Sequence, residues 1–434
     1  MGYSKSTKDL LLSAEEWSRE NLSTKTIAEA EEVIAQMSRK LSEHMMAAFA
    51  EKLDPKSTYE GMRIECECGG EAVFKGYRGR WVRTVCGDIR PSRAYYYCPG
   101  CHSGISPWDR EQGLDERVWS PGIKSLVSEC CARLTYSEVS GLLSRVLGFD
   151  VEESSQQDIV ADMGRRLRDA EEREIEACFD EDMEVIVERS PGRLYICVDA
   201  AKAHTDGAWH DIKTGVVFEG ERPVDASKSS RDKMANTCYI AAQEGCDEFG
   251  KRIYTHAVLS GLRRAGEVVA LGDGAEWIWN LVSMHFPGCV QILDYYHASE
   301  HIWALAGVLY GQDTPACKRW AKAQCERLKE SGPASLLRSL RRRKGRTQEQ
   351  REAIRLELGY FEDHELRMDY PTYIAKGMMI GSGPVESACK VVVGQRLKQA
   401  GMRWTKAGAD SILALRTTVL SGQTEHIQHL ARAA

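Results

Sequence analysis

The sequence has little proline, no long hydrophobic run and no large excess of charge of one sign. Its 434 residues contain 12 prolines against 37 glycines, and 43% of them are hydrophobic. This composition excludes a collagen-like or disordered chain and suffices for two to four domains with apolar cores. The apolar runs are shorter than the roughly 18 residues needed to span a membrane. The first residues lack the apolar core of a signal peptide.

The charge balance and the cysteine content exclude two further classes of protein. Lys and Arg number 58 against 64 Asp and Glu, which gives a net charge of -6 and excludes a uniformly basic nucleic-acid coat protein. Local basic patches stay possible. The 15 cysteines are too few and too unevenly spaced for a secreted disulfide scaffold. We expect a soluble, cytoplasmic protein.

Residues 1–60 are expected to form a helical segment. Ile34, Met37, Leu41, Met45 and Ala48 recur at the three- and four-residue spacing of an amphipathic helix. The apolar stripe predicts a packing or dimerisation helix.

Two cysteine pairs mark residues 61–110 as a metal-binding segment. Cys66 and Cys68 precede a Gly-Gly turn, and Cys98 and Cys101 form a Cys-x-x-Cys motif. A segment this small buries little apolar surface, so four thiolates around Zn²⁺ would supply folding free energy. The sequence therefore predicts a zinc-ribbon-like domain with these four ligands.

The stretch between the two pairs has the alternating pattern of strands, over residues 72–77, 80–85 and 93–97. The first pair is Cys-x-Cys, which is tighter than the usual spacing of zinc ligands. Cys86 and His102 are therefore alternative ligands.

Residues 111–190 are expected to be helical and to resemble a helix-turn-helix DNA-binding domain. One helix follows Leu134, a Gly148 turn ends it, and a second helix begins near Ser154 and becomes basic at its end. Plain helical bundles share this pattern. The residues expected to contact DNA lie on the second helix: Gln156 and Gln157 at base edges, and Arg165 and Arg166.

From residue 191 the pattern becomes that of a sheet. Three strands are expected at 194–199, 209–219 and 237–243. A helix, a strand at 267–272, another helix and a strand at 289–293 follow. Consecutive strands followed by strand–helix alternation predict a mixed sheet covered by helices. Residues 300–378 look like a charged helical insertion, and a last helix is expected at 385–397.

Acidic residues stand at the ends of these strands. Asp199 and Asp273 each follow an apolar strand, where a charge is costly unless it is paired or binds metal. Glu386 begins a helix after the glycine-rich turn at 381–384. Three carboxylates that converge on one sheet edge suit two divalent cations, the arrangement used to cleave phosphodiesters. Separate solvated acids in turns are the alternative interpretation.

Two segments carry a resemblance to a known family. LGDGAEWIWNLVSMHFPGCVQILDYYHASEHIW and GSGPVESACKVVVGQRLKQAGMRW closely resemble the DDE transposases of ISKra-type insertion sequences, which are relatives of the Mutator-like transposases. The similarity extends over residues 60–425. It implies an α/β multidomain protein whose catalytic domain, at 191–425, is a ribonuclease H-like mixed sheet with the helical insertion.

The resemblance also implies roles for residues. It makes Asp199, Asp273 and Glu386 the catalytic triad that holds Mg²⁺ or Mn²⁺, and it gives Asp294 and His297 a supporting role. Both Asp273 and Asp294 end strands. The glycines on either side of Asp273 favour it as the second ligand, because they let the backbone approach a metal–phosphate site.

A rival motif and two basic patches occur in the same region. His297, Glu300 and His301 fit the inverted zinc-protease signature His-x-x-Glu-His, for which no third ligand stands out. Residues 338–351 carry seven Lys or Arg against one acid. A second patch follows the third acid and is expected to hold DNA phosphates through Lys390, Arg396, Lys398 and Arg403.

The sequence thus predicts a transposase of a mobile element. It would bind double-stranded DNA at the inverted repeats that end the element, cleave there, and join the freed 3′-OH to target DNA in the nucleoid. Because such an enzyme acts on both ends of the element together, we expect a homodimer or a higher synaptic complex. Two alternatives stay open: a catalytically silent transposase that acts as a DNA-binding protein, and a ribonuclease H-like nuclease that cuts without joining.

Overall fold

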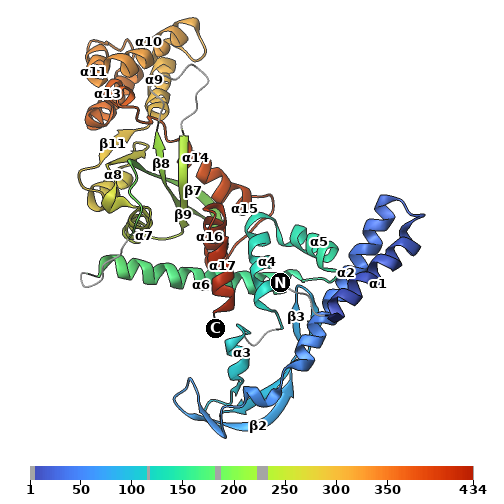
Figure 1. The fold of residues 1–434 in the computed structure, drawn as a ribbon. Helices are drawn as coiled ribbons and strands as arrows, with labels where there is room; N and C mark the ends of the chain where they lie inside the picture. Colours follow the sequence, from blue (N-terminus) through green and yellow to red (C-terminus); the bar gives the residue numbers. More distant parts are fainter. Residues whose placement is uncertain (1–4, 115–117, 181–186, 222–232, 434) are drawn as a thin grey trace. The chain divides into compact units, whose positions relative to one another are not determined.

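The computed structural model describes residues 5–114, 118–180, 187–221 and 233–433 (Figure 1). The chain divides into two compact units. The first comprises Met1–Leu126, Ser140–Glu152 and Gln428–Ala434, and the second comprises Val127–Val139 and Glu153–Ile427. The sequence-based boundaries near 110 and 190 do not coincide with this division. No helix in the described ranges is both long and apolar enough to cross a membrane.

The first unit begins with two helices, α1 (Lys5–Leu22) and α2 (Ile27–Lys52). Thr26 starts α2 with a capping box, in which its side chain accepts a hydrogen bond from the Glu29 N–H and the Glu29 carboxylate accepts one from the Thr26 N–H. The predicted apolar stripe of α2 faces solvent within the described chain. Its predicted members Ile34, Met37, Leu41, Met45 and Ala48 are all exposed, and so is the neighbouring Phe49.

A small antiparallel sheet follows, in the order β1 (Arg63–Glu65), β2 (Glu71–Gly79), β5 (Ser92–Tyr97) and β6 (Gly104–Ile105). A separate hairpin pairs β3 (Val82–Thr84) with β4 (Gly87–Ile89). The short helices η1 (Pro55–Thr58) and α3 (Pro107–Glu111) flank these strands. The core of the sheet consists of only five buried residues, Cys66, Ala72, Ala94, Tyr96 and Cys98. Such a small apolar core leaves room for a metal to stabilise the fold.

Three helices directly precede the large sheet, and the last two are those expected after Leu134 and near Ser154. The three are α4 (Pro121–Arg133), α5 (Tyr136–Leu147) and α6 (Glu153–Phe179). The long helix α6 packs in the second unit along α16 (Lys406–Leu420), where Gly164 lies against Ser411. This packing explains why residues 111–190 are not one compact unit of their own.

The second unit is built on a five-stranded mixed sheet in the order β11-β10-β7-β8-β9. The strands are β7 (Arg193–Thr205), β8 (Ala208–Glu221), β9 (Lys233–Ala242), β10 (Glu267–Gly272) and β11 (Val290–Leu293). The strands β7, β8 and β9 are antiparallel neighbours, whereas β10 and β11 run parallel to β7. The predicted α/β class and mixed sheet are confirmed.

Two helices, α7 (Cys246–Leu259) and α8 (Glu276–His285), pack on one face of this sheet. The short helix η2 (Leu262–Arg264) follows α7. Their apolar side chains bury Leu194, Ile196 and Val198 of β7. Because side chains alternate along a strand, Tyr195, Cys197 and Asp199 belong to the opposite face.

The predicted insertion is helical throughout. It contains α9 (Tyr295–Tyr310), α10 (Pro315–Ser331), α11 (Pro333–Arg341), α12 (Gln348–Asp363), η3 (Glu365–Arg367) and α13 (Tyr370–Ala375). In Figure 1 these helices gather beyond the β11 edge of the sheet.

The chain then returns to the sheet through α14 (Gly383–Ala388), the π-helix η4 (Cys389–Gly394) and α15 (Gln395–Leu397). Two helices that the sequence pattern did not reveal, α16 and α17 (Thr424–Arg432), complete the chain. The segments α14, η4 and α16 contact β7, β8 or β9, and η4 reaches the sheet face that carries Asp199 through its first residue, Cys389.

The contact between α6 and α16 leads to a stability prediction. A Cβ at Gly164 would lie 2.5 Å from the Cα of Ser411, whereas a Cβ at Gly359 in α12 would meet nothing within 4 Å. We expect Gly164→Ala to lower the free energy of unfolding by about 1–3 kcal/mol through overpacking. Gly359→Ala should leave it unchanged or raise it by up to about 1 kcal/mol. Urea unfolding of both variants measures this, and equal effects would contradict the packing account.

Candidate functional site

Three acidic residues lie side by side across adjacent parallel strands. Leu271 is the last residue of β10 that pairs with β7, opposite Cys197, and Asp273 and Asp199 each come two residues after this pair. Gly272 pairs with Leu293 of β11, so the next residues, Asp273 and Asp294, are also level. Residues in register on parallel strands share a sheet face. We call Asp199, Asp273 and Asp294 the acid row.

Asp199 differs from its predicted position at the end of a strand. It lies inside β7, because β8 continues to pair with β7 as far as Thr205. The parallel neighbour β10 ends at Gly272, one residue before Asp273. The Asp199 side chain therefore stands where the parallel part of the sheet stops, and both Asp199 and Asp273 are half-buried.

The electrostatic environment of Asp199 disfavours its charge. Burial is the main cause that raises the pKa of this carboxyl above its ordinary value, and the charge of Asp273 adds to the rise. Hydrogen bonds from the Ala200 N–H at 2.7 Å and from the Cys389 Sγ at 3.5 Å act in the opposite direction, as does His297. The carboxylates of Asp199 and Asp273 are both half-buried and repel each other. A cation bound between them would reduce this repulsion.

Glu386, the third predicted ligand, is tied to the acid row through a serine. The Ser382 hydroxyl donates to Asp294 and lies 3.2 Å from Glu386 Oε1. Asp294 itself is buried and accepts a hydrogen bond from the Tyr296 N–H, so that it caps α9. Glu386 is exposed on α14, a helix that contacts β7. Its carboxylate is thus accessible to a ligand while it remains within hydrogen-bond distance of Ser382.

Three residues of this region were missed by the sequence analysis. Ser382 joins two of the acids. Cys389 begins the π-helix and hydrogen-bonds Asp199. Tyr360 of the insertion packs against Gly274, next to Asp273. Ser382 and Cys389 lie three or four residues from Glu386 on the same helical segment, a spacing that the sequence does show. Nothing in the sequence points to Tyr360.

The insertion reaches the acid row through Tyr360 and α9. The Tyr360 hydroxyl is buried without a hydrogen-bond partner in the described structure, and burial together with Asp273 raises its pKa above the ordinary value. Its ring stacks on His301 at 3.8 Å between centroids, and Glu357 Oε2 lies 2.8 Å from His301 Nδ1. His301 is therefore engaged within the insertion. His297, one turn earlier, is half-buried on the side of Asp199.

The four predicted zinc ligands converge. Sulfur–sulfur distances are 3.5 Å between Cys66 and Cys101 and 3.6 Å between Cys68 and Cys98, and all four sulfurs lie within 4.8 Å of one another. Tetrahedral zinc–thiolate geometry requires about 3.8 Å between sulfurs. The four cysteines could thus bind a metal ion such as zinc, and the alternatives Cys86 and His102 are not needed. Within the described ranges no other set of three or more candidate ligands, the acid row included, is drawn together so closely.

Two residues predicted to contact DNA are buried instead. Gln156 has no exposed surface and accepts a hydrogen bond from the Cys131 thiol. Arg396 has none either, because it lies against the rings of Tyr136 and Trp404 and donates to the Cys131 carbonyl. Both predictions are corrected: these side chains join helices within the second unit.

The other predicted contacts to DNA lie on the surface. Gln157 and Arg165 are exposed, and Arg165 and Arg166 both pair with Asp162. An exposed group follows Glu386 along the chain and consists of Lys390, Lys398 and Arg403.

Comparisons with known proteins found a distant relative. No protein-family model matches the chain. A protein of Streptococcus gallolyticus named "UPF0236 protein in vanSb 3'region" is 23% identical over 414 residues, which cover 90% of this chain and 86% of that protein. The similarity thus extends over nearly the full length of both chains.

The raised pKa of Asp199 predicts a pH-dependent stability. At neutral pH the ionised carboxylate costs folding free energy, and this cost disappears as the pH falls through the folded-state pKa. We expect metal-free Asp199→Asn to be more stable than wild type at pH 7, with the difference shrinking towards about pH 4. Thermal unfolding across this range measures it, and Asp211→Asn, on the exposed part of β8, is the control. A less stable Asp199→Asn at pH 7 would contradict this account.

The cysteine cluster predicts that metal stabilises the first unit. We expect purified protein to contain about one zinc per chain by atomic absorption. A strong chelator, or Cys98→Ser, should remove the metal and unfold the small sheet. Cys86→Ser is the matched control because Cys86 lies outside the cluster. Retained zinc in Cys98→Ser, or loss in Cys86→Ser, would show that the ligand set is different.

Proposed function

We propose that this protein is a DDE transposase that cleaves the ends of an insertion sequence and joins them to target DNA. The observation that carries this proposal is the acid row with Glu386 beside it: carboxylates on one sheet face, set level by the register of β7, β10 and β11. Oxygen ligands of this kind suit Mg²⁺ or Mn²⁺, and repulsion between Asp199 and Asp273 favours a cation between them.

The sheet topology supports a ribonuclease H-like domain. Three antiparallel strands come first, and two parallel strands then follow on the other side of β7, in the order β11-β10-β7-β8-β9. The resemblance of residues 60–425 to ISKra-type transposases assigns the acids to this fold. The relative from Streptococcus gallolyticus is named without an activity, so it adds none.

Each residue of the site has a role that its position supports. When bound, two divalent cations would activate the attacking oxygen and stabilise the leaving 3′ oxygen. Asp199 and Asp273 would hold them from the rigid sheet. Glu386 would complete the ligand set from α14, with its carboxylate positioned by Ser382. Asp294 anchors Ser382 and the start of α9 and in this way supports the site.

His297 interacts electrostatically with Asp199 and would support the site near the scissile phosphate. The inverted zinc-protease interpretation is less favoured, because His301 is occupied by Glu357 and Tyr360.

Basic side chains are available for the DNA backbone. Lys390, Lys398 and Arg403 are exposed just after Glu386. A hollow of about 710 Å³ on the insertion is lined by two serines and five basic residues, Arg327, Arg338, Arg342, Arg343 and Lys344. Contacts of this kind to phosphates would make DNA binding strongly dependent on salt.

The first unit would bind the inverted repeats through its zinc-ribbon-like sheet, and α6 of the second unit would add Gln157, Arg165 and Arg166 as contacts. The exposed apolar stripe on α2 suits association of two chains on two element ends.

A Mg²⁺-dependent cleavage assay tests the proposal. The substrate is labelled duplex DNA that carries the boundary of the element beside which the gene lies. We expect wild type to nick at the boundary and to form a joined product. Asp199→Asn and Asp273→Asn should each lower the cleavage rate by about 100-fold or more while DNA binding persists. Asp211→Asn, the same change on exposed β8, should cleave like wild type.

The outcomes separate the alternatives. Cleavage without any joined product would indicate a nuclease that cuts only. Specific binding without cleavage by wild type would indicate a DNA-binding protein. Cleavage that survives in Asp199→Asn would show that the acid row is not the active site.

A further inference from the structure

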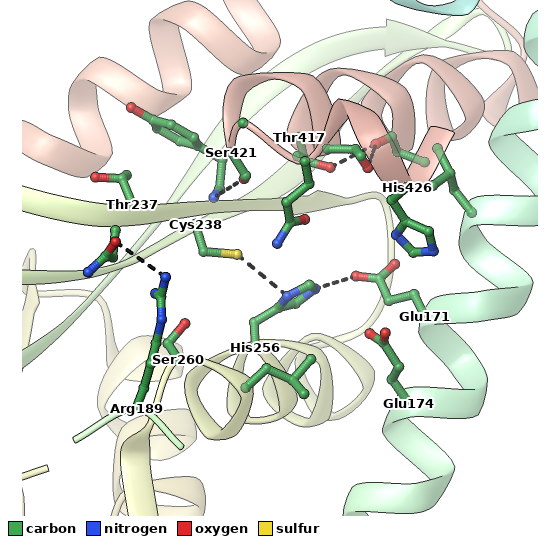
Figure 2. A pocket seen from close by; sticks show the side chains of 18 residues that line it. Glu171, Glu174, Arg189, Thr237, Cys238, His256, Ser260, Thr417, Ser421 and His426 are labelled. Carbon is green, nitrogen blue, oxygen red and sulfur yellow. Dashed lines mark hydrogen bonds and ion pairs between the residues drawn. The ribbon is translucent and has the colours of Figure 1, made fainter. Parts of the chain in front are cut away.

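The second unit also contains a polar pocket that is separate from the acid row. None of Asp199, Asp273 and Asp294 lines it. It is a cavity of about 640 Å³ between α6, β9, α7 and the helices at the end of the chain. Figure 2 shows His256 between Cys238 and Glu171, with side chains from all these elements pointing into the space. A pocket of this size is large enough for a small molecule.

Three residues in this pocket form a hydrogen-bonded relay. His256 Nδ1 lies 3.5 Å from the Cys238 sulfur, and His256 Nε2 lies 2.7 Å from Glu171 Oε1 (Figure 2). If Nε2 carries its proton toward the carboxylate, Nδ1 is the acceptor that faces the thiol. A thiol, an imidazole and a carboxylate in this order are the parts of an activated cysteine nucleophile.

The carboxylate end of the relay is fixed in its ionised form. Arg168 and Arg252 pair with Glu171 Oε2 at 2.7 Å and 2.5 Å. Burial alone would raise the pKa of Glu171, but Arg168, His256 and Arg252 hold it well below its ordinary value. A permanent negative charge thus faces His256 on the side away from the thiol.

His256 is consequently disposed to take the proton of the thiol. Burial opposes its charge, but Cys238 and Glu171 together raise the pKa of His256 well above its ordinary value. The surrounding titratable or charged groups lie on several elements, and they are Arg168, Glu171 and Glu174 on α6, Arg189 before β7, Arg252 on α7 and His426 on α17. Beyond them, Asp410 pairs with Arg168, while Glu172 and Glu244 pair with Arg252.

We propose that Cys238 is a nucleophilic thiolate at which this protein is modified by small electrophiles of the hydroperoxide class. Cys238 is 8% exposed and lines the cavity, so only a small reagent reaches its sulfur. The thiolate attacks one peroxide oxygen, so that an S–O bond forms and the O–O bond breaks. Sulfur is oxidised by two electrons to sulfenic acid and the peroxide is reduced. Protonated His256 gives its proton to the leaving hydroxide or alkoxide, which departs as water or an alcohol.

The test compares the pH dependence of alkylation at two cysteines of the full-length protein. Trypsin releases residues 234–251 as one peptide that contains both Cys238 and the exposed Cys246. Fragment ions report which sulfur carries iodoacetamide. We expect the rate at Cys238 to change less than about twofold between pH 6 and 8. In His256→Gln it should rise about tenfold per pH unit, as for a thiol that ionises alone.

A second readout uses hydrogen peroxide and a 1,3-diketone probe for sulfenic acid. We expect labelling at Cys238 in wild type and a rate at least about tenfold lower in His256→Gln. His426→Gln is the matched comparison, since His426 is the other histidine of the pocket.

Three results would overturn the proposal. One is a steep pH profile of Cys238 alkylation in wild type, which needs no variant to be folded. Another is folded wild-type protein in which Cys246 reacts and Cys238 does not. The third is a pH profile of Cys238 alkylation that changes in His426→Gln and stays the same in His256→Gln.

Discussion

The register of three parallel strands is the constraint on which the rest of the candidate site depends. Leu271 pairs with Cys197, and Gly272 pairs with Leu293, so Asp199, Asp273 and Asp294 each follow within two residues of these last pairs. A slip of one residue in either pair would turn one acid to the opposite face, among the apolar side chains under α7 and α8. The backbone pairing thus brings Asp199 into a partly buried position near Asp273, and burial, with a smaller effect of the Asp273 charge, raises the pKa of Asp199.

The remaining parts of the second unit act on this row from two sides. The segment α14–η4 brings Glu386, Ser382 and Cys389 to the sheet face that carries the acids. From the insertion, Tyr360 packs on Gly274 beside Asp273. The π-helix that directly follows α14, the helix of Glu386, is a local irregularity of a kind that is frequent at functional sites. The acids belong to the sheet and their partners belong to helices. A ligand that binds the acids would therefore act on both the sheet and these helices.

Much of the fold could be predicted because hydrophobic periodicity is a local property. The strands from β7 to β11, the helical insertion and the four converging cysteines all followed from short patterns in the sequence. Gln156 and Arg396 were wrongly predicted to contact DNA, although the sequence pattern indicates that both are buried. Gln156 precedes Ile159, Val160 and Met163 by three, four and seven residues, so it shares their buried face. Arg396 similarly follows Val392 and Val393 on the inner side of its helix.

Other features had no signal of that kind. The continuation of β7 beyond Asp199 depends on pairing with β8, and the position of Tyr360 depends on how the insertion folds back. Both are tertiary contacts between residues far apart in the sequence. The relay of Glu171, Cys238 and His256 is formed in the same way, from α6, β9 and α7.

Direct binding of a divalent cation to the acid row is the central claim, and Mn²⁺ titration followed by electron paramagnetic resonance tests it most directly. The account predicts that the zinc-loaded full-length protein binds Mn²⁺, that Asp273→Asn abolishes this binding, and that Asp211→Asn retains it. Equal Mn²⁺ binding by wild type and Asp273→Asn would contradict the account, as would a wild-type protein that binds none.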